Sequence, residues 1–306
     1  MESRVVQSKN RLPGEALEMI VLNLLGGLGN QMFVWALGRA MESRGKEVSY
    51  TKFFLNSDSG RRMLLPDVGI HPRMIDRHIG FNYTEPNLRY HPEVFSLSGD
   101  WTIHGYFQCE KYFESIQDTI RSEVFSGMSK SPMTQVIAEQ IQWLGDRTCF
   151  VHVRRSDNLS VRGLAFHGLT SAQDSTYYFK AMNYVRERVP GVRFFVFSDE
   201  PAWCRDCFLR GDDITVVDCN PPSFTIGAKF DLAKTDTGRE CEDLWLMSLC
   251  HHAIIANSSF SWFGAWLNPV EKTRERIVIA PEPWLADPRK DVMDIVPERW
   301  VKVPIK

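Results

Sequence analysis

Side chains of the kinds that bind phosphate groups stand at the end of one short apolar run. Residues 149–153 are apolar except for His152, and Arg154, Arg155 and Asp157 follow. Because side chains alternate along a strand, His152 and Arg154 are expected on one face. An arginine can bind a phosphate group through two parallel hydrogen bonds, so this strand end is predicted to meet a phosphate. A structural ion pair from either arginine to Asp157 is the alternative.

Two further apolar runs end in polar residues. Residues 194–197 lead to Asp199, whose carboxylate can accept two hydrogen bonds from a guanine edge or simply cap the next helix. Residues 253–256 lead to a helix start that carries Ser258 and Ser259. Its free backbone N–H groups and the positive end of its dipole suit a diphosphate, and helix capping is expected as well. Arginine, aspartate and serine after three strands together predict a phosphate-bearing ligand beside one sheet.

A glycine-rich turn at residues 26–31 follows the apolar run 19–22 and leads into helical spacing. The dinucleotide fingerprint requires a third glycine where this chain has Met32, and no Gly-Lys-Ser or Gly-Lys-Thr sequence follows. The alternative that the protein is a nicotinamide-dependent oxidoreductase is supported by this turn alone. A plain strand-to-helix turn is the other alternative.

Parallel sheets are the elements that would position these residues. Short apolar runs predict strands at residues 19–24, 149–153, 194–197, 214–217, 253–256 and 276–280. Helical patterns cover residues 31–43, 177–189, 242–251 and 261–267. This alternation predicts an α/β protein with parallel sheets, in which ligands bind beyond the carboxyl ends of the strands.

Two domains are more consistent with the pattern than one. A loop-rich and proline-rich stretch at residues 56–98 follows the first strand and helix, and the clear β/α alternation resumes near Cys149. The sequence Ser-Lys-Ser-Pro at 129–132 indicates a linker or a helix start. We therefore divide the chain into residues 19–140 and 141–306.

Composition narrows the classes of function. The 306 residues are 43% hydrophobic and 12% aromatic, which suffices for two cores, and a net charge of -2 argues against nucleic acid or a membrane surface. Seven cysteines fit reduced thiols and a cytoplasmic location, and the lone Cys-x-x-Cys at 204–207 is interpreted as structural. No run of about 18 apolar residues and no signal-peptide pattern occurs, so membrane insertion is not predicted.

Metal binding is not predicted either. Enzymes that hold a nucleotide diphosphate through a divalent ion usually carry an Asp-x-Asp sequence, and this chain has none. Arg154 and Arg155 are expected to supply the positive charge instead. His251 and His252 are adjacent and diverge on a helix, so they do not form an i, i+4 metal pair.

Six ordered blocks between Ile20 and Trp284 resemble the α-1,2-fucosyltransferase family. The blocks are GGLGNQ (26–31), HGYFQCEKYF (104–113), HVRRSD (152–157), FSDE with WC (197–204), DLWLMS (243–248) and IIANSSFSWFGAWLN (254–268). The resemblance implies two Rossmann-like domains that face each other across a cleft, the GT-B type, with the acceptor side in the first domain and GDP-fucose in the second. It also implies inverting transfer of L-fucose from GDP-fucose to the 2-hydroxyl of a galactose-terminated oligosaccharide, with no metal or other cofactor.

The resemblance assigns roles by position. His152 and Asp199 would meet guanine, Arg154 the β-phosphate, and Asn30 the phosphate or the fucose from the other domain. The full set predicted to bind the donor is Gly29, Asn30, His152, Arg154, Arg155, Asp199, Ser258, Ser259, Phe260 and Ser261. Arg154 would stabilise the departing diphosphate, and Asp157 is the candidate base for the acceptor hydroxyl; the alternative is that Asp157 only positions the arginines.

Acceptor contacts are expected from the middle block. Its candidates are Tyr106, Phe107, Gln108, Glu110, Lys111 and Tyr112, although Tyr106 and Phe107 could equally be core residues. The chain departs from the family at Ser156 and Asn158, where Gly and Tyr are usual, and at Phe263, where a second Trp is usual. Another GDP-sugar transferase and a non-catalytic sugar-binding protein remain as alternatives. The sequence names neither the acceptor nor the oligomeric state.

Overall fold

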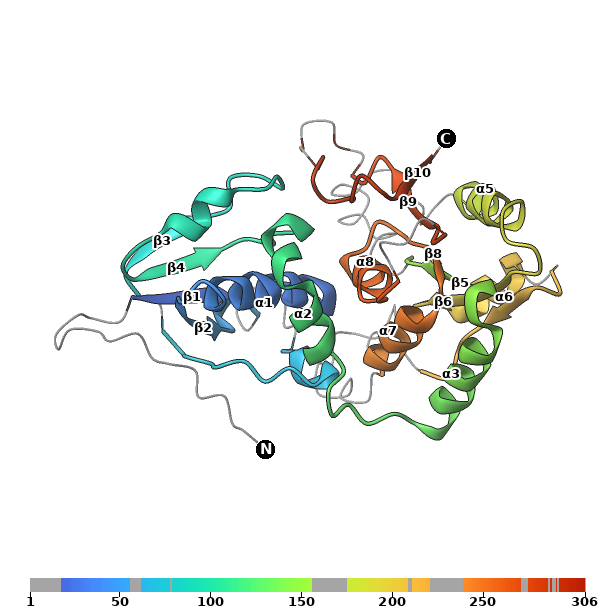
Figure 1. Ribbon diagram of the computed structural model, residues 1–306, viewed down its shortest axis with the longest axis horizontal. Helices are drawn as coiled ribbons and strands as arrows, with labels where there is room; N and C mark the ends of the chain where they lie inside the picture. The colour runs from blue at the N-terminus through green and yellow to red at the C-terminus, as the bar shows by residue number, and fades with distance from the viewer. Residues whose placement is uncertain are drawn as a thin grey trace.

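The computed structural model contains two parallel β-sheets, each flanked by helices (Figure 1). It describes residues 18–55, 62–77, 79–155, 175–208, 211–220, 239–270, 275–285, 287, 290 and 292–305. The predicted α/β architecture with two parallel-sheet domains is confirmed.

The N-terminal domain has a four-stranded parallel sheet with the order β2-β1-β4-β3. Its strands are β1 (Met19–Asn23), β2 (Glu47–Thr51), β3 (Phe81–Thr84) and β4 (Trp101–His104). Its helices are α1 (Leu28–Glu42), α2 (Gln117–Glu123) and the 3-10 turns η2 (Leu65–Val68), η3 (Pro92–Ser96), η4 (Glu110–Tyr112) and η5 (Glu114–Ile116). Strand β1 lies inside the sheet, and its apolar side chains are buried on both faces, as expected for a central parallel strand.

The C-terminal domain has a six-stranded parallel sheet with the order β10-β9-β8-β5-β6-β7. Its strands are β5 (Thr148–Val153), β6 (Arg193–Ser198), β7 (Ile214–Val216), β8 (His252–Ile254), β9 (Val278–Glu282) and β10 (Val301–Pro304). Its helices are α3 (Pro132–Leu144), η6 (Gly145–Arg147), α5 (Ser175–Arg186), α6 (Pro201–Phe208), α7 (Glu240–Leu249) and α8 (Ser259–Trp266). The chain builds β5, β6 and β7 outward in one direction and then returns to build β8, β9 and β10 in the other. The point where the strand order reverses therefore lies between β5 and β8, where open α/β sheets bind their ligands.

Helix α3 marks the passage between the domains. Ser131 caps it, because the Ser131 hydroxyl accepts a hydrogen bond from the Thr134 backbone nitrogen. The Thr134 hydroxyl donates to Asn220 over 3.1 Å, and the Ser131 nitrogen donates to Glu242 over 2.9 Å. Residues 132–140 thus group with the second sheet, and the predicted division after residue 140 runs through a helix. The helix start expected near Pro132 is observed.

An aromatic cluster joins the two domains. The Phe33 ring on α1 lies 4.6 Å from both the Trp262 and the Phe263 rings on α8, measured between centroids. Phe113 of the N-terminal domain adds an edge-to-face contact with Trp266 at 5.0 Å. All five side chains are buried, so α1 and α8, side by side in the middle of Figure 1, share one apolar core.

Candidate active site

His152 sits at the switch point of the second sheet as a buried, neutral imidazole. Only 5% of the residue is exposed, and burial lowers its pKa to about 3. Its Nδ1 atom has no hydrogen-bond partner among the residues that the structure describes. The ring lies 5.6 Å from that of Phe260 at the start of α8. Strand β5 and helix α8, predicted to share a ligand, therefore do meet.

Arg154 is oriented by Asp199, which directly follows the neighbouring strand β6. The Arg154 Nη1 atom lies 2.7 Å from Asp199 Oδ2, and Asp199 Oδ1 accepts from the Arg155 backbone nitrogen over 3.0 Å. Asp199 is thus bound through both oxygens. The turn before α6 is stabilised instead by Ser198, whose hydroxyl accepts from the Glu200 nitrogen. Asp157, the expected ion-pair partner and candidate base, lies outside the described residues, as do Ser156 and Asn158.

Arg155 is held against α6. Its Nε donates to Glu200 over 3.0 Å, and its guanidinium lies 3.8 Å from the centre of the Trp203 ring. These contacts give Arg155 a structural role in fixing the end of β5. A direct contact with the ligand stays a prediction for this side chain.

The first turn of α8 offers backbone donors. Its first helical hydrogen bond runs from the Trp262 nitrogen to the Ser258 carbonyl, so the N–H groups of residues 259–261 precede the helical ladder. Within the described chain, the Ser258 side chain makes no capping bond, although Ser258 occupies the N-cap position. Ser261 is fully buried, and its hydroxyl lies within 3.4 Å of the Ala256 and Ser258 carbonyls. Ser261 is therefore a structural residue, while Ser258 and Ser259 are half-buried.

The glycine turn brings a second helix N-terminus to the same place. A Cβ atom built on Gly29 would lie 2.4 Å from the Ser259 carbonyl carbon and 2.5 Å from the Phe260 nitrogen. Only glycine permits this approach, so Gly29 serves as a contact between the two helices. The N-terminal ends of α1 and α8 converge here, and each carries partial positive charge. Such a junction favours an anion.

The two polar residues at the end of the glycine turn, Asn30 and Gln31, have different hydrogen-bond partners. Gln31 is fully buried and binds the Gly26 carbonyl as well as the backbone of Arg62 and Leu64. Asn30 is half-buried, and its Oδ1 accepts a hydrogen bond of 2.7 Å from Gln108. Asn30 directly follows Gly29, which contacts α8, and its contact with the donor stays a prediction.

Part of the middle block joins the domains, and burial corrects the predicted acceptor set at Phe107, Glu110 and Tyr112. Glu110 is buried, and its carboxylate binds Trp266 Nε1 at 3.0 Å and the Arg299 guanidinium. Phe107 and Tyr112 are core residues. The remaining members are Lys111, paired with Asp294; Gln108, bonded to Asn30; and Tyr106, which is 37% exposed. Spacing alone did not show that Glu110 and Lys111 have partners in the other domain.

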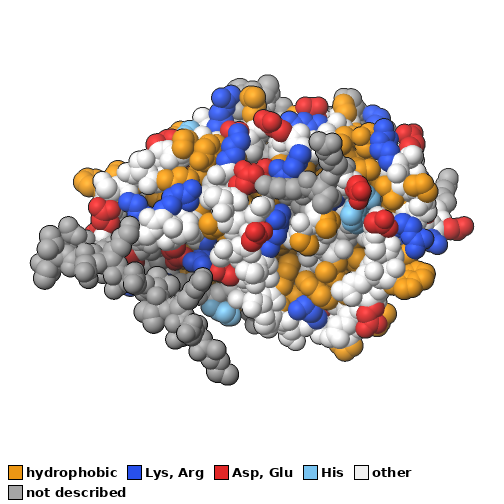
Figure 2. Space-filling model, viewed as in Figure 1, with side chains coloured by type: hydrophobic (Ala, Val, Ile, Leu, Met, Phe, Trp, Pro, Cys, Tyr) orange, Lys and Arg blue, Asp and Glu red, His pale blue; other side chains and the backbone are white. Residues whose placement is uncertain are grey.

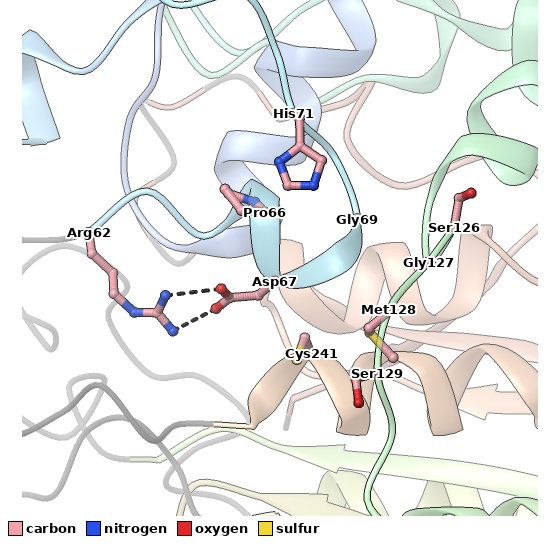
Figure 3. A pocket seen from close by; sticks show the side chains of 10 residues that line it. All are labelled: Arg62, Pro66, Asp67, Gly69, His71, Ser126, Gly127, Met128, Ser129 and Cys241. Atoms are coloured by element: carbon pink, nitrogen blue, oxygen red, sulfur yellow. Dashed lines mark hydrogen bonds and ion pairs between the residues drawn. The ribbon is translucent and has the colours of Figure 1, made fainter.

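A cavity of about 430 Å³ opens between the N-terminal domain and α7 (Figure 3). The residues that line it are Arg62, Pro66, Asp67, Gly69, His71, Ser126, Gly127, Met128, Ser129 and Cys241. Arg62 and Asp67 form two hydrogen bonds at one edge. None of the residues predicted to bind the donor lines this cavity, so we do not place the donor in it.

The predictions about metal binding and membrane insertion concern the described residues as a whole. The described residues contain no group of three or more His, Cys, Asp or Glu side chains that is suited to a metal ion. No helix within the described ranges is long and apolar enough to cross a membrane. In the Cys-x-x-Cys pair, burial raises the pKa of Cys204 to about 12, which fits the structural interpretation.

Two α/β domains with parallel sheets, in contact through the N-terminal ends of α1 and α8, form a fold of the GT-B type. The profile described as Glycosyl transferase family 11 matches residues 83–304. An alpha-1,2-colitosyltransferase of Escherichia coli is 31% identical over 94% of this chain and 99% of its own length. Galactoside alpha-(1,2)-fucosyltransferase 1 of Bos taurus is 26% identical over 63% of this chain and 51% of its own.

Among solved structures, fucosyltransferase NodZ from Bradyrhizobium superposes with a TM-score of 0.50 at 14% identity, over 83% of this chain and 94% of its own, which shows the fold alone. The profile match and the colitosyltransferase show that the chain belongs to glycosyl transferase family 11. The resemblance to α-1,2-fucosyltransferases is thereby confirmed, and the nicotinamide oxidoreductase alternative falls away.

Proposed function

We propose that this protein transfers L-fucose from GDP-fucose to the 2-hydroxyl of a terminal galactoside. The observation that carries the proposal is the convergence of the α1 and α8 N-termini at Gly29, with His152 against Phe260 and Arg154 two residues further along the same strand end. Two helix ends and a guanidinium suit a diphosphate. The names of the relatives, which include colitosyl- and fucosyltransferases, support a deoxysugar donor and an α-1,2 product.

In the proposed reaction, the acceptor oxygen attacks the anomeric carbon of fucose and the bond from that carbon to the β-phosphate oxygen breaks, with inversion. GDP leaves with the bonding electrons. The negative charge on the β-phosphate is complete only late in the reaction, so Arg154 and the N–H groups of α8 stabilise the transition state more than the bound donor. Arg154 would do this without a divalent ion.

The acceptor proton needs a base. Asp157 is the proposed base, three residues beyond Arg154 in the sequence. The alternative is that a phosphate oxygen of the donor takes the proton and Asp157 only positions the arginines. If Asp157→Asn leaves both turnover and GDP binding near normal, the base role is wrong.

Guanine would meet His152. A neutral imidazole carries one N–H donor and one acceptor nitrogen, so either tautomer offers Nδ1 a hydrogen bond with a base edge. Because both Asp199 oxygens are bound in the structure, we propose that Asp199 contributes mainly by holding Arg154. A direct bond from Asp199 to guanine would require this pair to rearrange.

GDP-colitose is a second candidate donor, because the Escherichia coli relative is named for colitose. Colitose is L-fucose without its 3-hydroxyl group, so one pocket contact separates the two sugars. The test is incubation with lactose and EDTA and with GDP-fucose, GDP-colitose or GDP-mannose in parallel, followed by linkage analysis. A fucosyl product at the 2-hydroxyl of galactose supports the proposal, transfer of colitose alone supports the second donor, and transfer from none of the three contradicts both.

A further inference from the structure

We infer that Gln108 is a positioning residue that orients the Asn30 side-chain amide toward the donor substrate. The inference deepens the proposed function and rests on it. Gln108 belongs to the block that was expected to contact the acceptor, and its observed partner is instead a residue of the glycine turn.

The contact fixes which end of the amide remains available. Gln108 Nε2 donates to Asn30 Oδ1 over 2.7 Å, so the Asn30 oxygen is occupied. The Asn30 Nδ2 atom makes no hydrogen bond to any residue that the structure describes. Nδ2 is a donor only, and its natural partner is an oxygen of a phosphate or a sugar. The pairing thus presents the correct end of the amide to an anionic ligand.

Gln108 is itself held firmly. It follows Phe107, a buried residue with a φ of 50°, which a non-glycine residue adopts only when its surroundings impose it. Glu85 imposes it, because its two carboxylate oxygens accept from the backbone nitrogens of Tyr106 and Phe107 over 2.7 and 3.1 Å. Strand β4 and this turn therefore deliver Gln108 to Asn30 with little freedom.

Gly26 supports the amide from its other side. A Cβ atom built on Gly26 would lie 2.4 Å from Asn30 Nδ2, and the φ of Gly26 is +64°. The Asn30 amide therefore lies against Gly26 while Gln108 holds its oxygen. Asn30 directly follows Gly29, which contacts the first turn of α8, so the amide belongs to the turn that meets the backbone donors proposed for the diphosphate.

Substitution of Gln108 by glutamate tests the orientation directly. A carboxylate cannot donate to Asn30 Oδ1 and repels it, and the repulsion is relieved when the Asn30 amide turns over. The flipped amide presents its oxygen to the phosphate, so Gln108→Glu should weaken GDP binding more than Gln108→Ala. We expect a rise in Kd for GDP and in KM for the donor of roughly tenfold or more for Gln108→Glu, with kcat changed less.

A double-mutant cycle separates this role from a general structural one. In an Asn30→Ala background, Gln108→Glu should change the Kd for GDP by less than about twofold, because no amide remains to orient. An equal effect in both backgrounds would show that Gln108 acts independently of Asn30 and would overturn the inference. Calorimetry with GDP gives the Kd, and thermal unfolding checks that each variant is folded.

Two glycine variants test the position of the Asn30 amide independently, in case the Gln108 variants fail to fold. Gly26→Ala and Gly45→Ala place the same methyl group at positive φ, but nothing lies within 4 Å of a Cβ on Gly45. Gly26→Ala should weaken GDP binding and Gly45→Ala should not; equal GDP affinity in both overturns the inference. If the wild type fails to bind GDP, the proposed function and this inference both fail. If the wild type binds GDP and Gln108→Glu binds it equally well, this inference alone fails.

Discussion

At the residue scale, the Arg154–Asp199 ion pair joins the ends of strands β5 and β6 beside the buried His152. Strand alternation predicted His152 and Arg154 on one face, because side-chain period is a local property. In the structure, burial is the largest cause of the lowered His152 pKa, and the Arg154 charge also helps to lower it. Among the described residues Arg154 binds Asp199, and this pair depends on β6 lying next to β5. Strand order is a property of the whole sheet, so no local pattern could reveal it.

Arg154 should be needed for turnover. Arg154→Ala is expected to lower kcat by roughly 100-fold or more, because it removes a charged donor from the developing negative charge. Arg154→Lys is the matched control, since it retains the charge without the planar fork and should recover only part of the activity. Calorimetry with GDP is the second measurement. An unchanged GDP affinity in Arg154→Ala would remove its phosphate role.

His152 should make stability depend on pH. Burial lowers its folded-state pKa to about 3, whereas the unfolded chain takes up this proton near pH 6.5. As pH falls from 6.5 toward 3, the unfolded state therefore gains a proton that the folded state lacks, and stability decreases. Between pH 7 and 5 the free energy of unfolding should fall by roughly 2 kcal/mol more in the wild type than in His152→Gln. Urea unfolding at both pH values measures this, and parallel losses in the two proteins would contradict it.

At the element scale, β1 and most strands of the second sheet were predicted, whereas β2, β3, β4 and β10 were missed. Strands β5, β6 and β8 lie on mostly apolar, buried stretches and could be predicted directly. Strands β3 and β10 are short and largely exposed edge strands, so their composition resembles that of loops. The glycine turn was located correctly, but the role of Gly29 could not be predicted, because α8 lies 230 residues further along the chain.

Gly29 and Gly38 offer a matched comparison on α1. Alanine at Gly29 would collide with the α8 backbone, whereas alanine at Gly38 would collide with the Tyr50 side chain inside the N-terminal domain. Both variants should lower thermal stability. Gly29→Ala should also weaken GDP binding, because it displaces the first turn of α8, and Gly38→Ala should leave GDP affinity unchanged. Equal effects of the two variants on GDP affinity would argue against a ligand at the junction of the two helices.

At the scale of the whole molecule, the two domains share a core rather than a loose hinge. Phe33 and Phe113 pack among the aromatic rings of α8, and the Arg121 guanidinium binds the Trp266 carbonyl. On the face seen in Figure 2, acidic and basic side chains of the described residues are interspersed, in keeping with a net charge of -2. The two-sheet architecture was predictable from the β/α alternation. The shared core was not, because it joins residues of distant blocks.

Unfolding should therefore be cooperative across both domains. Phe33→Ala is expected to lower the free energy of unfolding by about 3–5 kcal/mol, the usual cost of removing a buried aromatic ring. Phe33 lies on a helix of the first domain and packs against a helix of the second. The wild type should therefore give one calorimetric unfolding transition, and the variant should give one transition at a lower temperature. Two separate transitions in the wild type would show that the domains unfold independently.

The contacts of Glu110 and Lys111 with the second domain can form only late in biosynthesis. Glu110 and its partner Arg299 are 189 residues apart, and Lys111 and Asp294 are 183 residues apart. A ribosome therefore releases the N-terminal sheet long before the groups that neutralise Glu110 exist. Burial of a carboxylate without a partner is unfavourable. During synthesis we therefore expect Glu110 to stay exposed to water until the second domain is almost complete. Formation of the Glu110–Arg299 ion pair would then be one of the last events in biosynthesis. It would join the two domains only in chains that have been translated through Arg299.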